Sequence, residues 1–467
     1  MSKTPKVSVG SANAILPTSI NVAGSGGPGS PMIHNGPLST KIRLVYYGDS
    51  PSASTGFGTV AKNILIPLYK TGNYDISVLG VNYWGDPHPF PFRIWPMAGG
   101  LGADHRDPFG RGKAKNLLLD SNGLKYDVFF NLQDTFILEP FLPEFVAAAR
   151  ATGRKFKTVY YFPIDGTPKA SWMKPVLSAD APVTYTNFGY NECIKVHPEL
   201  ADKLKIIPHG ANIKDFYPLP PEAVRAWKSQ YFKGKEDCFM LLNVNRNQQR
   251  KDLPRTIAAF RKVKDAIPNA MLYMHCAIQD QGWRMDEVCK AYGFDLRAPN
   301  PDIVMPVNIH PGVGVPIQLL NNIYNAADMV VSTTLGEGWG LSATEAMAVK
   351  KCCVFPDNTS LTEIFADGRG ALVKSGDTAS NWTVIVNDNE IPRPLTNVDD
   401  MANTIISLYK NPILRENIAQ KAYDFVTNNW QWDKHIAPQW DRIFKEQYNQ
   451  LGKETTTQAG SINGVVL

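Results

Sequence analysis

Short apolar segments alternate with helix-length segments along most of this chain of 467 residues. The apolar segments are rich in β-branched and aromatic residues, as expected for strands that are buried on both faces of a sheet. Parallel strands must be joined by long crossovers, usually helices, so the alternation predicts α/β domains with parallel sheets. The first series of predicted strands is 42–47, 76–81, 128–131, 158–162, 183–186 and 204–207.

A Pro-rich break divides the alternation into two series. Helices are predicted at 60–69 and 140–149 within the first series. The break, Tyr217-Pro218-Leu219-Pro220-Pro221, is followed by a short predicted helix at 222–231. The second series of predicted strands is 239–244, 271–275, 303–307, 329–332, 352–355 and 371–373.

This division predicts two doubly wound, Rossmann-like domains at 39–216 and 237–414, joined by a linker at 217–236. The switch points of two such sheets, if they face one another, form a single cleft. Residues 1–38 are rich in Gly, Ser and Pro, and they cannot bury enough apolar surface to offset the entropy of ordering. We therefore predict a disordered N-terminal tail, a C-terminal helix at 415–451 and a second tail at 452–467.

The composition is that of an ordinary soluble protein, with 43% hydrophobic and 19% charged residues. No apolar run approaches the roughly 18 residues that span a bilayer, and the N-terminus has no signal-peptide pattern. The six cysteines include no Cys-x-x-Cys pair, which favours buried thiols in a reducing compartment. We expect a cytoplasmic protein, and its net charge of +5 is compatible with a phosphate-bearing ligand.

The segment from Leu335 to Ala348 follows the predicted strand at 329–332 and contains a Gly-rich turn leading into a helix. Glycines let the backbone approach a ligand closely, and a helix N-terminus offers free N–H groups to a phosphate. Glu337 and Glu345 flank this turn and can hold sugar hydroxyls. The pattern is typical of a nucleotide-sugar site, although two solvated glutamates beside a structural turn would explain the same residues.

This segment resembles the Glu-x7-Glu signature of retaining glycosyltransferases of the GT-B architecture, and in particular their family 4. The resemblance implies that Glu345 holds the ribose and Glu337 the donor sugar. It adds a donor-binding turn made of Gly338, Trp339, Gly340 and Leu341. It also assigns the first predicted domain to the acceptor and the second to the donor, with a C-terminal helix that crosses back to the first domain.

Arg246 and Lys251 are five residues apart in the loop after the predicted strand at 239–244. Both cations can converge on one diphosphate, Arg with a planar fork and Lys as a point charge. The family resembled here uses an Arg and a Lys at this spacing to neutralise the leaving nucleoside diphosphate. Arg250 is a further cation that can substitute for either, and a basic surface loop is the alternative.

In the first predicted domain, two loops are candidates for the cleft. The loop after the first strand contains Gly56 and Gly58, where relatives carry a glycine-rich loop opposite the donor phosphates. Asp165 follows the strand at 158–162, where many relatives carry a histidine. Asp165 is a candidate to orient an acceptor hydroxyl or stabilise an oxocarbenium-like centre, and a simple turn aspartate is the alternative. His209 and Glu363 are further cleft candidates, each with a structural alternative.

No Asp-x-Asp pair occurs in the sequence. Enzymes that hold a diphosphate through a divalent cation use such carboxylates, because hard cations prefer oxygen ligands. Together with the cations near residue 250, this predicts diphosphate binding without a metal or other cofactor. With no adjacent nucleophile evident, we favour front-face attack, in which the acceptor proton passes to the leaving phosphate oxygen.

The acceptor and the nucleotide base, whether UDP, GDP or ADP, stay open. The acceptor could be a glycan, a glycolipid or a small molecule, and the aromatic segment 83–92 could stack a sugar or a nucleobase. Basic residues at 150–157 leave a hydroxymethylated base of phage DNA open. Two other classes also stay open: a GT-B sugar-nucleotide epimerase or hydrolase, and a non-catalytic sugar-nucleotide-binding scaffold.

Overall fold

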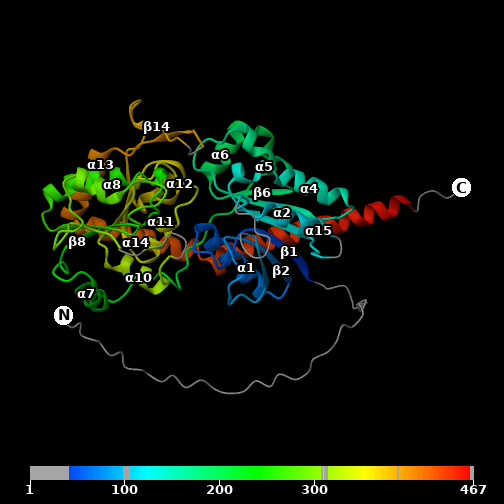
Figure 1. The fold of residues 1–467 in the computed structure, drawn as a ribbon, viewed down its shortest axis with the longest axis horizontal. Coiled ribbons are helices and arrows are strands. Elements are labelled where there is room, and N and C mark those ends of the chain that lie inside the picture. Colours follow the sequence, from blue (N-terminus) through cyan, green and yellow to red (C-terminus); the bar gives the residue numbers. More distant parts are fainter. Residues whose placement is uncertain are drawn as a thin grey trace, which may run out of the picture. The chain divides into compact units, whose positions relative to one another are not determined.

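The computed structural model describes residues 41–97, 106–120, 123–306, 309, 314–386 and 389–462, of which 453–462 are described by their backbone alone (Figure 1). The predicted tail at 1–38 lies outside these residues.

The N-terminal sheet has seven parallel strands in the order β3-β2-β1-β4-β5-β6-β7. Strand β1 lies in the middle of the sheet. Strands β2 and β3 are added on one side of it and β4 to β7 on the other, which is the doubly wound pattern. The predicted strands are present, and the short edge strand β3 is an addition that the sequence did not indicate. The strands are β1 (Ile42–Asp49), β2 (Tyr74–Val81), β3 (Arg93–Pro96), β4 (Val128–Leu132), β5 (Lys157–Phe162), β6 (Ala181–Thr184) and β7 (Lys205–Ile206).

Both faces of this sheet are buried, because alternate residues of each strand pack in different apolar clusters. On β1, Leu44 and Tyr46 pack in one cluster, and Val45 and Tyr47 pack in another. Helices therefore cover the sheet on two sides, as expected for crossover connections. The helices of this domain are α1 (Gly56–Lys70), α2 (Arg111–Leu119), α3 (Thr135–Leu138), α4 (Leu142–Ala151), α5 (Lys174–Ser178) and α6 (Asn187–Val196).

The C-terminal sheet repeats the same winding with six parallel strands in the order β10-β9-β8-β11-β12-β13. A separate antiparallel pair, β14 (Trp382–Val384) and β15 (Pro392–Pro394), follows it. The strands of the sheet are β8 (Phe239–Asn243), β9 (Ala270–Met274), β10 (Ile303–Val304), β11 (Met329–Val331), β12 (Cys352–Pro356) and β13 (Ala371–Val373). The helices are α8 (Leu253–Ala266), α9 (Met285–Ala291), α10 (Ile317–Ala326), α11 (Leu341–Ala348), α12 (Thr359–Ile364) and α13 (Val398–Lys410).

The connection between the sheets runs from β7 to β8 and contains α7 (Pro221–Tyr231). Its Pro-rich start is fixed by two amide side chains of α10. Asn321 accepts a hydrogen bond from the backbone N–H of Tyr217 at 3.2 Å, and Asn325 accepts one from Leu219 at 2.8 Å. These bonds satisfy backbone donors that proline-rich sequence cannot pair in a sheet.

The C-terminal region differs from the predicted single helix at 415–451. Helix α14 (Pro412–Asn429) ends at Trp430, and one π-helical turn at Trp432–Ile436 leads into α15 (Ala437–Ile462). Helical backbone thus extends into the predicted tail at 452–467. The break lets Trp430 and Trp432 turn inward, where a Cβ on Gly210 would lie 2.6 Å from the Trp432 ring.

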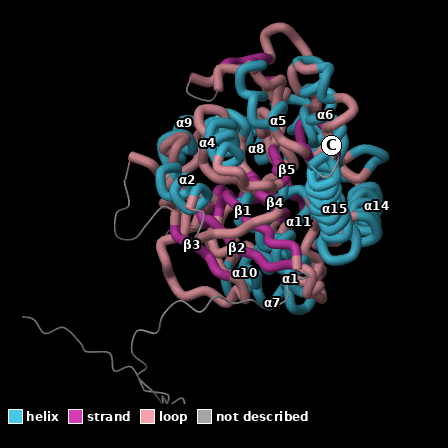
Figure 2. Tube along the Cα trace, turned by 90° about the vertical axis from the view of Figure 1, so that its right-hand side faces the viewer, coloured by secondary structure: helices cyan, strands magenta, loops and turns pink. Residues whose placement is uncertain are grey.

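Helix α15 packs on the N-terminal sheet although it follows the C-terminal one in the sequence (Figure 2). The Trp440 ring centroid lies 5.1 Å from that of Phe130 and 4.6 Å from that of Tyr161. Tyr74 donates a hydrogen bond of 2.7 Å to Asp441. The same apolar cluster continues through Trp432 and Trp339 to the C-terminal sheet, so one core links the two.

None of the six cysteines is in a disulfide. Among the described residues, no helix combines the length and the apolar character needed to cross a membrane.

Candidate active site

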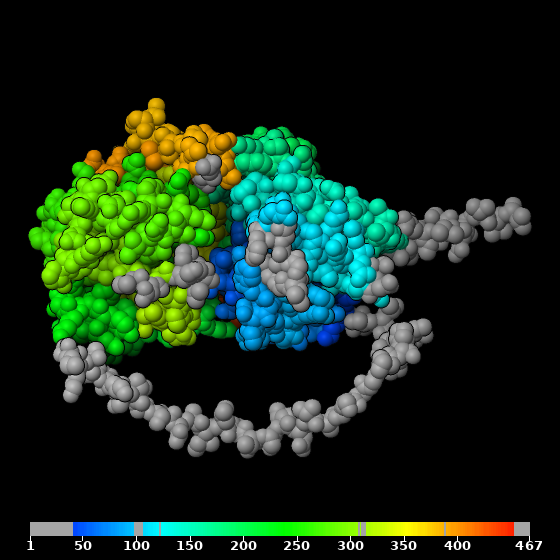
Figure 3. Space-filling model, viewed as in Figure 1, coloured from blue at the N-terminus to red at the C-terminus, as the bar shows by residue number. Residues whose placement is uncertain are grey.

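A cavity of about 1080 Å³ lies where the carboxyl ends of both sheets meet. Figure 3 shows the groove between the green surface of the C-terminal sheet domain and the blue and cyan surface of the N-terminal one. We call its lining residues between 49 and 209 the N-terminal wall, and those between 244 and 389 the C-terminal wall. The predicted cleft is thus present, at the switch points where α/β folds bind ligands.

The two walls come so close together at the turn before α11 that the turn must be made of glycine. A Cβ on Gly336 would lie 2.5 Å from the carbonyl oxygen of Asp165, and one on Gly338 would lie 2.6 Å from Cβ of Pro163. Gly340 has φ of +101°, a conformation that side chains with a Cβ rarely adopt. These glycines place Glu337 at the point where the walls touch, and Gly338, Trp339, Gly340 and Leu341 all line the cavity.

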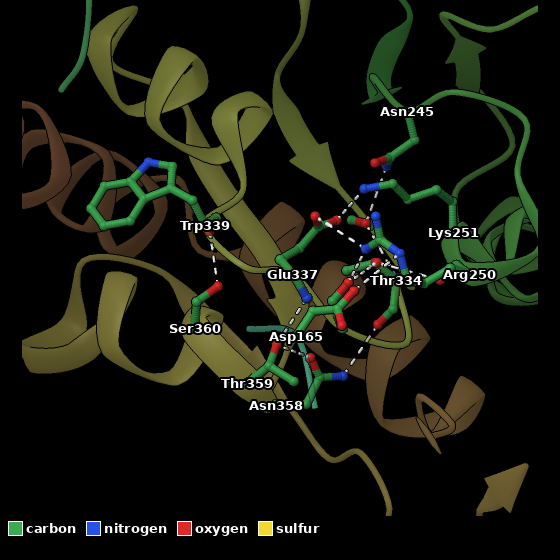
Figure 4. Close-up of polar contacts among 12 residues, drawn as sticks. Asp165, Asn245, Arg250, Lys251, Thr334, Glu337, Trp339, Asn358, Thr359 and Ser360 are labelled. Atoms are coloured by element: carbon green, nitrogen blue, oxygen red, sulfur yellow. Dashed lines mark hydrogen bonds and ion pairs between the residues drawn. The ribbon is translucent and has the colours of Figure 1, made fainter. Parts of the chain in front are cut away.

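Glu337 is paired with two cations of the loop after β8. Lys251 Nζ donates to Glu337 Oε1, and Arg250 lies 3.4 Å from Oε2 (Figure 4). Burial by itself would raise the pKa of Glu337, but the charges of Lys251 and Arg250 outweigh it and lower the pKa to about 2. Burial also lowers the pKa of Lys251, which Glu337 partly offsets. Glu337 is therefore a carboxylate held beside two cations.

Asp165 bridges the two walls. Its carboxylate lies 3.3 Å from Nε of Arg250 and 3.5 Å from Arg393, and its carbonyl accepts a 3.1 Å hydrogen bond from Arg393. Arg393 belongs to β15, and its side chain is only 1% exposed. The sequence indicated Asp165 but gave no signal for Arg393, which has no motif around it.

The spacing of Arg246 to Lys251 predicts that both bind one diphosphate, but in the structure Arg246 is paired with an aspartate. Its guanidinium pairs with Asp280 through bonds of 2.6 and 3.1 Å. Arg246 still lines the cavity and is 45% exposed, whereas Arg250 is 23% exposed. The cation placed directly against Glu337 together with Lys251 is Arg250, the residue that the sequence offered only as a substitute.

Glu345 lies on α11 and lines the same cavity. Tyr324 of α10, which is fully buried, donates a 2.7 Å hydrogen bond to Glu345 Oε2. Burial raises the pKa of Glu345 to about 7, against the hydrogen bond from Tyr324, which lowers it. Tyr324 was not a sequence candidate, since a tyrosine in an apolar helix is ordinary core.

The loop before α1 is held by a helix cap and a tight turn. Thr55 caps the helix by accepting a 3.0 Å bond from the N–H of Gly58. A Cβ on Gly58 would lie 2.5 Å from the carbonyl of Ala53, so this glycine shapes the turn. Gly56 lines the cavity and faces Leu341 of the opposite wall, with 3.4 Å between its ideal Cβ position and Leu341 Cδ1.

His209 lines the cavity and is buried within an aromatic cluster. Its ring centroid lies 4.1 Å from that of Tyr185 and 5.4 Å from that of Trp339. Neither ring nitrogen has a hydrogen-bond partner among the described residues, and burial lowers the pKa of His209 to about 3. His209 is therefore neutral. The Trp339 side chain points away from Glu337, and its carbonyl accepts a bond from Ser360 (Figure 4).

Glu363 is not among the described residues that line the cavity. Its carboxylate accepts hydrogen bonds from the N–H of Asn187 at 2.9 Å and from that of Phe188 at 3.3 Å. It therefore occupies the N-terminus of α6, where a helix dipole favours negative charge. The structural alternative for Glu363 fits this contact, which ties α12 to the N-terminal domain.

The two segments that the sequence offered for acceptor binding, 83–92 and 150–157, lie outside the described cavity lining. No residue of 83–92 is among the described residues lining the cavity. Arg150 pairs with Asp180 at 2.7 Å, and Arg154 donates to the carbonyl of Leu124 at 2.8 Å. These two arginines make internal contacts rather than projecting as an unpaired basic patch.

Among the described residues, no three His, Cys, Asp or Glu side chains are grouped to hold a metal ion. Metal independence nevertheless stays a prediction.

Comparison with known proteins agrees with this fold. Residues 241–411, which include most of the C-terminal wall, match the family described as glycosyl transferases group 1. A curated relative, the putative glycosyltransferase EpsD of Bacillus subtilis (strain 168), is 28% identical over 192 residues. That match spans 38% of this chain and 42% of the relative, so less than half of either protein is compared.

Solved structures extend the fold similarity to most of the chain. Sucrose-phosphate synthase from Thermosynechococcus elongatus has a TM-score of 0.68 at 16% identity and covers 88% of this chain and 100% of its own. HepE of Anabaena, solved with UDP and glucose, has a TM-score of 0.63 at 15% identity and covers 87% of this chain and 100% of its own. The fold is therefore GT-B, two Rossmann-like domains around a cleft.

Proposed function

We propose that this protein is a retaining glycosyltransferase that moves a sugar from a nucleoside-diphosphate sugar to a hydroxyl acceptor without a metal ion. The observation that carries the proposal is the pairing of Glu337 with Lys251 and Arg250 in a cavity between two Rossmann-like domains. Similarity of residues 241–411 to glycosyl transferases group 1 supports it. The UDP and glucose in the HepE structure make UDP-glucose the first donor to test.

The roles follow from charge and position. Arg250, Lys251 and Arg246 would bind the diphosphate and stabilise the charge that develops on it as the bond to the sugar breaks. Glu337, already ionised, would accept hydrogen bonds from donor sugar hydroxyls. Glu345 would bind the ribose hydroxyls, and Leu341 and Ser342 at the start of α11 line the same cavity, where a helix N-terminus favours a phosphate.

The proposed reaction breaks the bond between the anomeric carbon and the diphosphate oxygen, and it forms a bond between that carbon and the acceptor oxygen. The acceptor proton passes to the departing diphosphate oxygen on the same face. Asp165, which lies where the walls meet, would orient the acceptor hydroxyl or stabilise positive charge on the sugar. Since Asp165 is paired with Arg250 and Arg393, a ligand that engages Arg250 would also affect Asp165.

The test is a thermal-shift screen with UDP, GDP, ADP, dTDP and their glucose conjugates, each with and without EDTA. A ligand at about 100 times its Kd should stabilise the protein by about 2.7 kcal/mol. We expect a shift with one nucleotide that EDTA does not change, and NMR of the product should show a retained anomeric configuration. No shift with any nucleotide would contradict the proposal and favour a scaffold, whereas donor conversion without acceptor would favour an epimerase or hydrolase.

A further inference from the structure

The two walls of the cavity carry different charges. All lysines and arginines among the described lining residues, Arg246, Arg250 and Lys251, belong to the C-terminal wall. The C-terminal wall balances these three cations with Asp280, Glu337 and Glu345, whereas the described part of the N-terminal wall contributes three carboxylates and no lysine or arginine: Asp49, Asp134 and Asp165. Asp165 is already paired with Arg250 and Arg393, at 3.3 and 3.5 Å. Because the described lining of this wall supplies carboxylates and no lysine or arginine of its own, a phosphate group bound against it would meet like charges, which costs binding free energy.

Gln133 gives this wall an unused hydrogen-bond donor. It lies just after β4, lines the cavity and is 5% exposed. Its Oε1 accepts the N–H of Asp134 at 3.0 Å, and its carbonyl accepts the Tyr160 hydroxyl at 3.1 Å. Its side-chain NH2 has no partner among the described residues. Gln133 Nε2 is not among the fully buried unpaired side-chain atoms, so this NH2 group is open to the cavity that Gln133 lines. A polar ligand atom there can accept its hydrogen bond in place of water.

Three phenylalanines supply apolar faces on the same wall. Phe57, Phe109 and Phe136 all line the cavity and are only half-buried. Phe136 is braced from behind by Trp172, with ring centroids 5.6 Å apart. Half-buried aromatic faces beside hydrogen-bonding side chains suit a ligand that is apolar on one face and polar at its edge.

We infer that the N-terminal wall binds an uncharged, polyhydroxylated ring, so that the acceptor is a neutral sugar rather than a sugar phosphate or a nucleic acid. The phenylalanines would contact the C–H face of the ring, and the Gln133 amide and the carboxylates would bind its hydroxyls. This inference rests on the proposed function and specifies its acceptor. The transferred atoms are those given above, with an acceptor hydroxyl of the neutral sugar as the attacking group.

The test compares acceptors that differ in charge. With the nucleotide sugar identified by the screen, nucleotide release and product mass are measured with neutral sugars and with their phosphates: glucose and glucose 6-phosphate, fructose and fructose 6-phosphate, and maltose. An oligonucleotide containing 5-hydroxymethylcytosine is the nucleic-acid arm. We expect at least one neutral sugar to be used with a kcat/KM at least about tenfold above its phosphate, a difference of about 1.4 kcal/mol.

A variant tests the wall itself. Gln133→Leu keeps the approximate size of the side chain and removes the donor, so the KM for the neutral acceptor should rise at least about tenfold, as for a lost buried hydrogen bond. Nucleotide Kd, measured separately, reports donor binding. Gln420→Leu, on α14 outside the described cavity lining, is the matched control, and it should leave the acceptor KM unchanged.

The outcomes separate this inference from the proposed function. Preference for a sugar phosphate or for the oligonucleotide would overturn the inference while leaving glycosyl transfer intact. A protein that binds and hydrolyses the donor but uses no acceptor would overturn both the inference and the proposed glycosyl transfer, because that result favours the hydrolase. If no nucleotide sugar binds at all, the proposed function itself fails. An acceptor KM that Gln133→Leu leaves unchanged would remove Gln133 from the acceptor wall.

Discussion

The two sheets have the same winding, yet the loops after their first strands have different chemistry. After β1, the loop contains no lysine or arginine and ends in the Thr55 cap and the tight turn at Gly58. After β8, the equivalent loop carries Arg246, Arg250 and Lys251. Each loop follows the carboxyl end of its strand, and the cavity lies where the carboxyl ends of the two sheets meet. The loop sequence then determines which side can bind an anion.

Lys251→Ala tests the anion-binding loop after β8 most directly. We expect kcat to fall by about 10²–10³-fold, the scale of losing one preorganised donor to developing charge. The control is Lys262→Ala on α8, whose 2.9 Å pair with Asp399 is exposed and far less important energetically. Steady-state kinetics with the identified donor measure the effect, and unchanged turnover would remove Lys251 from the site.

Gly336→Ala tests whether the walls must touch. Its Cβ would lie 2.5 Å from the Asp165 carbonyl, so the walls must shift apart and Glu337 must move with them. A displacement of about 1 Å at reacting groups can lower the rate by about 10²-fold, and we expect a loss approaching that. Gly112→Ala in α2, where a Cβ meets nothing within 4 Å, is the control. Wild-type kinetics for Gly336→Ala would show that the contact is unnecessary.

Arg250→Ala and Arg246→Ala decide which arginine accompanies Lys251. Arg250 contacts both Glu337 and Asp165, whereas Arg246 is more exposed and already paired with Asp280. We expect kcat/KM to fall about tenfold further for Arg250→Ala than for Arg246→Ala, as one charged contact more is lost. Parallel kinetic measurements answer this. The reverse order would mean that Arg246 leaves Asp280 for the diphosphate, as its spacing to Lys251 predicts.

The pH dependence of nucleotide binding should be the smallest effect. Because the pKa of Glu345 is raised to about 7, its carboxylate form, which accepts hydrogen bonds from ribose, is populated as pH rises through 7. Because Glu345 ionises over this range, we expect the affinity for the nucleotide to increase a few-fold between pH 6 and 8.

Tyr324→Phe sharpens this prediction. Losing the hydrogen bond that lowers the pKa of Glu345 should move the midpoint to higher pH and weaken binding at pH 7 by about tenfold or less. Glu345→Gln, which cannot titrate, provides the baseline for the titration of the nucleotide itself. Calorimetric Kd values across this range measure the effect, and identical profiles for wild type and Glu345→Gln would contradict it.

Histidine at position 209 shows how local and tertiary information differ. The sequence placed His209 at the end of the first domain, near the cleft, and the structure has it lining the cavity. Its surroundings, however, are Tyr161, Tyr185 and Trp432, contributed by distant segments. That enclosure lowers the pKa of His209 to about 3, because burial disfavours the charged imidazolium.

The sequence by itself determined the two parallel sheets and the position of the Gly-rich turn between Glu337 and Glu345. Both depend on short-range patterns: buried strands are continuous apolar runs, and a turn that approaches another chain segment needs glycine. The family resemblance also pointed to the cleft residues of the second domain, because its motif lies within a few residues of one strand and one helix.

Only the tertiary structure decided which charges meet. Arg393 reaches Asp165 across 228 residues of sequence, Tyr324 reaches Glu345 from another helix, and Lys251 reaches Glu337 across 86 residues. No local pattern encodes such pairings, because they depend on how both sheets and the β14–β15 pair are placed. The choice of Arg250 over Arg246 as the neighbour of Glu337 has the same origin: spacing fixes which cations are available, and packing fixes which one faces the carboxylate.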